Sequence, residues 1–122
     1  MVVVDTNVLV DVLRGMPQAV DAFEHIDDEI VVPSMVRFEV LAGAWPSELA
    51  VIQRLLALCI DAPVDGLVAD AAAAFARRYA KSHASIDPID FVVAATTQLL
   101  GATLMTRNVK HFPMFQRLRP PY

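Results

Sequence analysis

Three acidic side chains of this sequence stand in otherwise apolar stretches, where a carboxylate needs a specific partner. Asp5 follows a run of three valines, Glu39 lies inside an apolar segment, and Asp90 precedes another. Burying an ionised carboxylate is costly unless it is paired or coordinates a cation. With the amide oxygen of Asn108, these carboxylates form a hard-oxygen set suited to Mg²⁺ or Mn²⁺. Such ions promote phosphodiester displacement by generating a hydroxide nucleophile and by stabilising charge.

Each of these residues also has a purely structural explanation. Asp5 can cap a helix that begins just after it, and Glu39 can face solvent or pair with Arg37. Asp90 suits the dipole at the start of its helix, and Asn108 can be a turn residue. Because each explanation competes well with catalysis, the spacing alone makes a weak case for a metal site.

The elements that must position these acids follow an alternating pattern. Short apolar runs alternate with segments of helical periodicity, which predicts an α/β domain with a mainly parallel sheet. Ligands of such sheets bind at the carboxyl ends of the strands, where Asp5 and the pair Arg107-Asn108 are expected. We expect strands at residues 1–4, 29–32, 59–63 and 102–105, and helices at 6–14, 17–26, 34–42, 46–58, 64–82 and 89–100.

The helix that begins after Asp87 has the clearest signature in the chain. Asp87 is a good N-cap, Pro88 suits the first helical position, and Gly101 stops the helix. This pattern favours a mainly structural role for Asp87. Ser34 is expected to cap the helix at 34–42, and the proline-containing tail is expected to form turns and at most a short edge strand.

Length and composition limit the class of protein. The 122 residues suit a single domain over residues 1–122. The sequence has no apolar run of about 18 residues and no signal-peptide pattern, so we expect a cytoplasmic protein that does not enter a membrane. The single cysteine, Cys59, agrees with that compartment. The 56% apolar content predicts that part of the surface is buried against a partner or a second copy.

The formal net charge of −4 at first argues against nucleic acid as a ligand. The charges are unevenly distributed, because acids crowd the first third of the chain and no acid follows Asp90. The same C-terminal stretch contains Arg107, Lys110 and His111. Net charge therefore does not exclude a nucleic-acid substrate.

Three blocks of sequence, in this order, resemble the PIN-domain ribonucleases, and in particular the VapC-type toxins of VapBC toxin–antitoxin pairs. Residues 2–9 (VVVDTNVL) are similar to the family's first strand and its Asp-Thr-Asn motif, and residues 36–43 (VRFEVLAG) to its Glu-bearing helix. Residues 90–96 (DFVVAAT) and 104–112 (LMTRNVKHF) resemble its acid-led helix and Thr-Arg-Asn strand end. The resemblance implies a three-layer α/β/α sandwich around a mainly parallel sheet of four to five short strands.

The resemblance also implies a set of site residues. Asp5, Glu39 and Asp90 would be the catalytic acids and would hold one or two Mg²⁺ or Mn²⁺ ions. Asn108 stands where many relatives have a fourth acid, which puts a second metal site in doubt, and Asp87 is a substitute candidate. The remaining implied residues are Thr6 and Asn7, which would orient Asp5 or the substrate, and Arg107 and Lys110, which would contact RNA.

The implied activity is that of a toxin that hydrolyses RNA phosphodiester bonds with a metal-activated water. Single-stranded loops expose unstacked bases, so a structured RNA with an exposed loop is the expected substrate. The family further implies a homodimer and a VapB-type antitoxin whose apolar segment fills a groove between helices. Trp45, Phe38 and Leu41 are candidates for that groove.

Two other functions compete with this interpretation. A phosphatase of the haloacid dehalogenase type would use an aspartate like Asp5 as nucleophile, but it would normally have a second aspartate where this chain has Asn7. A catalytically inactive PIN-like module for RNA or protein binding is supported mainly by Asn108. The sequence leaves open the RNA target, the cleavage sequence and the number of metal ions.

Overall fold

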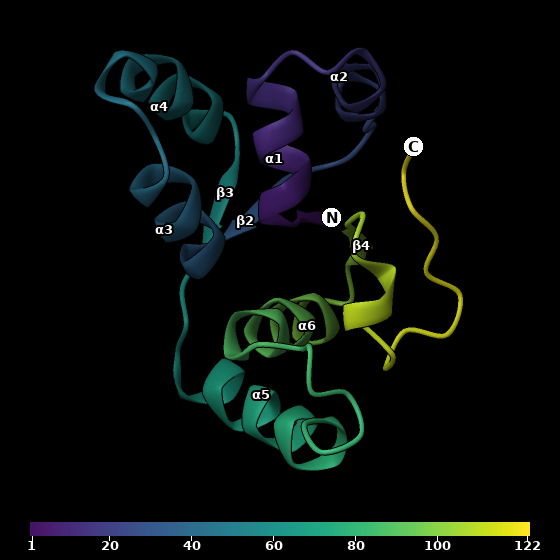
Figure 1. The fold of residues 1–122 in the computed structure, drawn as a ribbon. Coiled ribbons are helices and arrows are strands. Elements are labelled where there is room, and N and C mark those ends of the chain that lie inside the picture. The colour runs from purple at the N-terminus through teal and green to yellow at the C-terminus, as the bar shows by residue number, and fades with distance from the viewer.

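The computed structural model describes residues 1–122 and contains a sheet of four short parallel strands (Figure 1). The strands are β1 (Val2–Val4), β2 (Ile30–Pro33), β3 (Ile60–Ala62) and β4 (Thr103–Met105), in the order β3-β2-β1-β4. All neighbouring strands pair in parallel. The predicted mainly parallel sheet is confirmed, with four strands.

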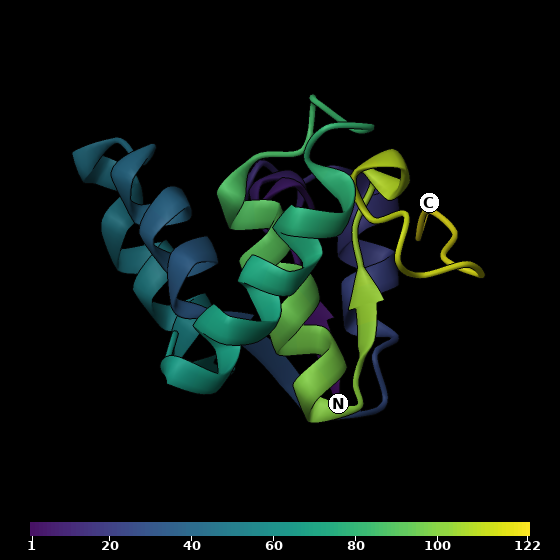
Figure 2. The same cartoon turned by 90° about the horizontal axis from the view of Figure 1, so that it is seen from below.

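Helices cover both faces of the sheet and form the outer layers. Figure 1 shows α1 and α2 above the strands and α5 and α6 below them, with α3 and α4 at one flank and the C-terminal tail at the other. In the view from below, α5 and α6 lie in front of β1, and β4 runs beside α6 (Figure 2). The helices are α1 (Thr6–Leu13), α2 (Pro17–Glu24), α3 (Ser34–Ala42), α4 (Leu49–Ala57), α5 (Gly66–Tyr79) and α6 (Pro88–Leu100), and two short 3₁₀ helices are η1 (Pro46–Glu48) and η2 (Val109–His111).

Several element boundaries differ from the sequence-based prediction. Ser34 is the first residue of α3 and not its N-cap, because Pro33 still belongs to β2 and occupies the cap position without a side-chain bond. Helix α5 begins after Asp65, whose side chain accepts a hydrogen bond from the Val68 N–H at 2.9 Å. The tail forms η2 and turns and adds no edge strand.

The core lies between the sheet and its helices and is built largely from β-branched side chains. Val3, Val4, Val31 and Val32 are essentially inaccessible to solvent, as expected for strands covered on both faces. Phe112, from the tail, is also fully buried in this core. The tail is therefore fixed to the domain although it lacks regular strands. None of the helices has the length and apolar character needed to cross a membrane.

The strand order places two distant segments side by side at the carboxyl end of the sheet. Val4 pairs with Met105, and the Asp5 N–H donates to the Met105 carbonyl at 3.0 Å. Asp5 and Thr106, the residues that follow β1 and β4, are therefore adjacent. This juxtaposition of residues far apart in the sequence defines the candidate site.

Candidate active site

Asp5 is the most deeply buried acid of this edge of the sheet, with 4% of its surface exposed. Its Oδ1 accepts a hydrogen bond from the Thr6 N–H at 2.8 Å. Its Oδ2 accepts from the Thr106 hydroxyl at 2.8 Å and from Asn7 Nδ2 at 3.1 Å. Asp5 thus caps α1, as its structural explanation required, and is also held rigidly at the end of β1.

Thr106 is the centre of this hydrogen-bond network and is completely buried. Its hydroxyl donates to Asp5 and accepts from Asn7 Nδ2 at 3.2 Å and from the Asn108 N–H at 3.0 Å. The side-chain Oδ1 of Asn7 accepts a hydrogen bond from the Arg107 backbone N–H at 2.9 Å. Asn7 therefore joins β1 to the segment after β4. Its hydrogen bond to Asp5 is consistent with the expected role of orienting that carboxylate.

Asp90 reaches the same region from the start of α6. Its Oδ2 accepts the Asp87 N–H at 3.3 Å, while Asp87 Oδ1 accepts the N–H groups of Ile89 and Asp90 at 2.8 and 3.1 Å. This reciprocal capping box fixes both carboxylates at the positive end of the helix dipole. The Nδ1 atom of His111, on η2, lies 3.0 Å from Asp90 Oδ2.

Burial and like charge raise the pKa values of Asp5 and Asp90. Burial raises the pKa of Asp5, with a smaller contribution from the Asp87 charge, against the opposing hydrogen bonds from Thr106, Thr6 and Asn7. Burial raises the pKa of Asp90 to about 6, and the negative charges of Asp87 and Asp5 add to the rise. Asp5, Asp87 and Asp90 therefore lie within electrostatic reach of one another, an arrangement that a bound cation would stabilise.

Glu39 is connected to this cluster through one shared residue. Its Oε1 accepts the Thr6 hydroxyl at 2.7 Å, and the Thr6 backbone N–H donates to Asp5. The alternative pairing of Glu39 with Arg37 is not found, because Arg37 pairs with Asp61 at 3.7 Å. Thr6 therefore bridges the first and second acids of the predicted set.

The structure thus assembles most of the predicted residues but does not form a closed metal cage. No three His, Cys, Asp or Glu side chains converge closely enough to hold an ion as they stand. Asn108 and Lys110 are exposed, and only the backbone N–H of Asn108, not its side-chain amide, joins the buried network. The donor set nevertheless fits a hard cation. The carboxylates at this edge of the sheet repel one another, and their oxygens are the ligands that hard divalent cations prefer.

Two residues of the site were not assigned from the sequence. Thr106 belongs to the Thr-Arg-Asn motif, but its central position in the network depends on the pairing of β1 with β4, which no local pattern reveals. His111 belongs to the basic C-terminal stretch of the sequence, and the structure places its ring against Asp90. The run of polar residues after β4 was the available signal for both.

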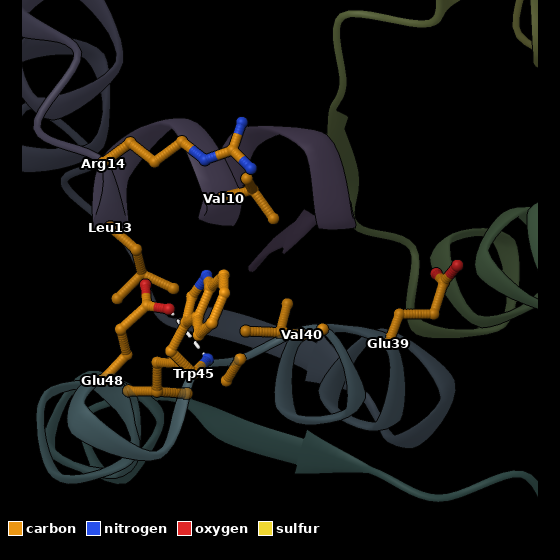
Figure 3. A pocket seen from close by; sticks show the side chains of 10 residues that line it. Val10, Leu13, Arg14, Glu39, Val40, Trp45 and Glu48 are labelled. Carbon is orange, nitrogen blue, oxygen red and sulfur yellow. Dashed lines mark hydrogen bonds between the residues drawn. The ribbon is translucent and has the colours of Figure 1, made fainter.

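A separate pocket of about 210 Å³ lies between α1 and the segment from α3 to α4. In Figure 3, the Trp45 ring occupies the space between the two sides, and the carboxylate of Glu39 extends away from it. Trp45 is 74% exposed, and Phe38 is exposed but does not line the pocket. Leu41 instead packs against the core. The lining residues are Val10, Leu13, Arg14, Glu39, Val40, Gly43, Ala44, Trp45, Glu48 and Ile52.

Comparisons with known proteins agree with this arrangement. Residues 2–117 match the family model of the PIN domain. The chain is 41% identical to Ribonuclease VapC19 of Mycobacterium tuberculosis (strain H37Rv) over 125 residues, which cover 100% of both chains. It is 35% identical to Ribonuclease VapC10 of the same organism, with 100% of this chain and 93% of the relative covered.

The fold is also similar to that of solved proteins. A toxin–antitoxin complex from Klebsiella pneumoniae contains a chain that superposes with a TM-score of 0.83 at 26% identity. The match covers 100% of this chain and 98% of that chain. The α/β architecture, the family model over nearly the whole length and the full-length relatives lead to one conclusion. This chain belongs to the PIN domain family.

Proposed function

We propose that this protein is a divalent-metal-dependent endoribonuclease that acts as the toxin of a toxin–antitoxin pair. The observation that supports this best is the acidic cluster at the carboxyl end of the sheet, where Asp5 and Asp90 are buried and repel each other. The full-length relatives named as VapC ribonucleases support the same activity. The substrate class that follows is RNA, and the reaction is hydrolysis of a phosphodiester bond.

The chain's own residues would fix the reacting groups. Asp5 is held by three hydrogen bonds and Asp90 by the start of α6, so neither carboxylate can move far. Thr6 positions Glu39 as the third acid. Rigid placement of charged groups before the reaction is a large part of catalysis, because it avoids the cost of reorganisation in the transition state.

Asp5, Asp90 and Glu39 would hold one or two Mg²⁺ or Mn²⁺ ions, which supply an activated water and neutralise charge on the leaving oxygen. Asp87 is a secondary candidate, because its charge acts on both Asp5 and Asp90. Asn108 is a weaker candidate, since its side-chain amide lies outside the buried network. Lys110 is exposed on η2, where it can contact an RNA phosphate.

The decisive experiment is cleavage of total RNA by the purified protein, freed of any antitoxin, in Mg²⁺ or Mn²⁺. We expect discrete cleavage that stops in EDTA and in the D5A and D90A variants. The D70A variant, which removes an exposed carboxylate of α5, should cleave like the wild type. The proposal fails if the RNA stays intact and divalent ions do not raise the melting temperature of the wild type above that of D5A and D90A.

A toxin of this kind needs an antitoxin, and the pocket around Trp45 offers a docking site. The pocket combines apolar side chains of α1, α3 and α4 with Arg14, Glu39 and Glu48. We propose that an apolar segment of a VapB-type antitoxin inserts here. The Klebsiella relative was solved as a toxin–antitoxin complex, which supports a partner of this class. Homodimerisation stays a prediction, which sedimentation equilibrium of the isolated protein can check.

A further inference from the structure

Asp11 is a buried carboxylate for which the proposed reaction has no use. It lies on α1, is 4% exposed, and contacts two residues that are far away in the sequence. Arg107 Nε lies 2.6 Å from Asp11 Oδ2, and Arg107 Nη2 donates to Asp11 Oδ1 at 3.4 Å. The Tyr122 hydroxyl donates to the same Oδ2 at 2.7 Å. Asp11 thus joins α1, the segment after β4 and the tail.

The ion pair leaves much of the arginine accessible. The Arg107 side chain is 45% exposed, whereas that of Asp11 is 6% exposed. A guanidinium has five N–H donors in one plane, and Asp11 engages the edge formed by Nε and Nη2. No other carboxylate pairs with Arg107. The buried partner therefore fixes the plane of the group while its opposite edge can bind a second anion.

Arg107 is also held next to the acidic cluster. Its backbone N–H donates to Asn7, and the Asn7 amide donates to Asp5. The Arg107 backbone is therefore one residue away from Asp5, and its guanidinium lies at Asp11, one turn of α1 beyond Asn7. An RNA strand that places one phosphodiester at Asp5 also brings its neighbouring phosphates close to the protein. The net charge of −4 opposes the approach of these phosphates. A fixed cation at this position offsets that repulsion for one phosphate.

We propose that Arg107 binds a phosphate of the RNA strand that flanks the scissile bond, and that Asp11 and Tyr122 are positioning residues for its guanidinium. The inference rests on the proposed ribonuclease function and adds to it a subsite and two residues. A bidentate arginine–phosphate contact is directional, so its strength depends on the orientation that Asp11 and Tyr122 impose. The alternative is that the three residues only anchor the tail.

The test is binding of a short fluorescein-labelled single-stranded RNA in EDTA, where cleavage cannot proceed. We expect R107Q to weaken binding about tenfold, the size of one charge-assisted contact. R107K keeps the charge but not the planar donors, so it should also weaken binding. The control R54Q removes an exposed cation of α4 and should bind like the wild type. Melting temperatures of all variants identify any that fail to fold.

A positioning role for Asp11 predicts non-additive effects. D11N and the milder Y122F should each weaken RNA binding, and D11N should add nothing in the R107Q background, since it acts through the arginine. The slope of log affinity against log salt should fall by about 0.7 in R107Q, as for one lost phosphate contact to a single strand. If the three residues only anchored the tail, their substitution would lower the melting temperature without changing the RNA affinity or its salt dependence.

The outcomes separate this inference from the proposed function. If the wild type cleaves RNA with Mg²⁺ but R107Q binds RNA as tightly as R54Q does, the inference is wrong and the ribonuclease function stands. Additive effects of D11N and R107Q would equally overturn the positioning role. If the wild type neither binds nor cleaves RNA, both are wrong.

Discussion

At the scale of single residues, the site consists of carboxylates whose ionised forms are disfavoured by burial and by the negative charges beside them. Asp5 and Asp90 are buried beside each other's charge and that of Asp87, and hydrogen bonds from the surrounding residues offset only part of the cost. A fold keeps such an arrangement where a bound cation stabilises it during function, since strained or destabilised groups concentrate at active sites. The stability of the free protein should therefore improve when one of these charges is removed.

Replacing Asp90 by asparagine should stabilise the protein in EDTA at neutral pH. The change removes a buried charge that repels Asp5 and Asp87, while the amide oxygen can still accept the Asp87 N–H. We expect a melting temperature roughly 3–6 °C above that of the wild type, as for a gain of about 1 kcal/mol. The control D70N, on the exposed side of α5, should leave it unchanged. In Mg²⁺ the order should reverse, and a D90N protein that melts below the wild type in EDTA would contradict this account.

The Asp11 cluster makes a prediction about pH. Burial and the bond to Asp11 raise the pKa of Tyr122 to about 12, although the nearby Arg107 opposes the rise. The neutral phenol is the form that the fold stabilises, so its contribution to stability is complete below the ordinary pKa of about 10 and is lost as the pH rises through about 12. Phenolate absorbance should show a late component that Y122F removes and Y79F retains. Its persistence in Y122F would mean that another group is responsible.

At the scale of elements, helix α6 links folding to the site because its capping box contains two of the acids. Asp87 and Asp90 satisfy the first N–H groups of the helix, so the same side chains start α6 and supply negative charge to the site. The capping role of these residues is observed, and it is compatible with the functional role that we propose for them. The two roles can be separated by choosing substitutions that keep one of them.

Asp87→Ala and Asp87→Asn should therefore have different consequences. Alanine removes the cap and should destabilise the protein by about 0.5–2 kcal/mol, whereas asparagine caps nearly as well as aspartate. Both remove a charge that acts on Asp5 and Asp90, so both should weaken Mg²⁺ binding severalfold. Urea denaturation and Mg²⁺ titration of the melting temperature measure the two effects. Equal Mg²⁺ affinity for wild type and D87N would limit Asp87 to capping.

At the scale of the whole molecule, the sequence predicted what local patterns encode and missed what tertiary pairing creates. Alternating apolar runs and helical segments predicted the parallel α/β sheet, and the position of Asp5 after a strand predicted the edge where it lies. The central position of Thr106 depends on β1 and β4 lying side by side, although about 100 residues separate them. The hydrogen bond from Tyr122 to Asp11 likewise depends on how the tail folds back, which proline spacing alone does not determine.

The exposed pocket around Trp45, where we propose that an antitoxin docks, shares only Glu39 with the acidic set, so substitutions of the other lining residues can separate the two surfaces. Trp45 is the only tryptophan and is 74% exposed, so its fluorescence reports on this surface alone. Adding the VapB-type antitoxin that we propose as the partner should shift its emission to shorter wavelength, because the ring leaves water. W45A should cleave RNA like the wild type but need more of that partner for inhibition, whereas L58A, which removes an exposed leucine outside the pocket, should be inhibited normally. Normal inhibition of W45A would show that the partner reaches the acidic cluster without this pocket, and the antitoxin would then have to be sought on another face.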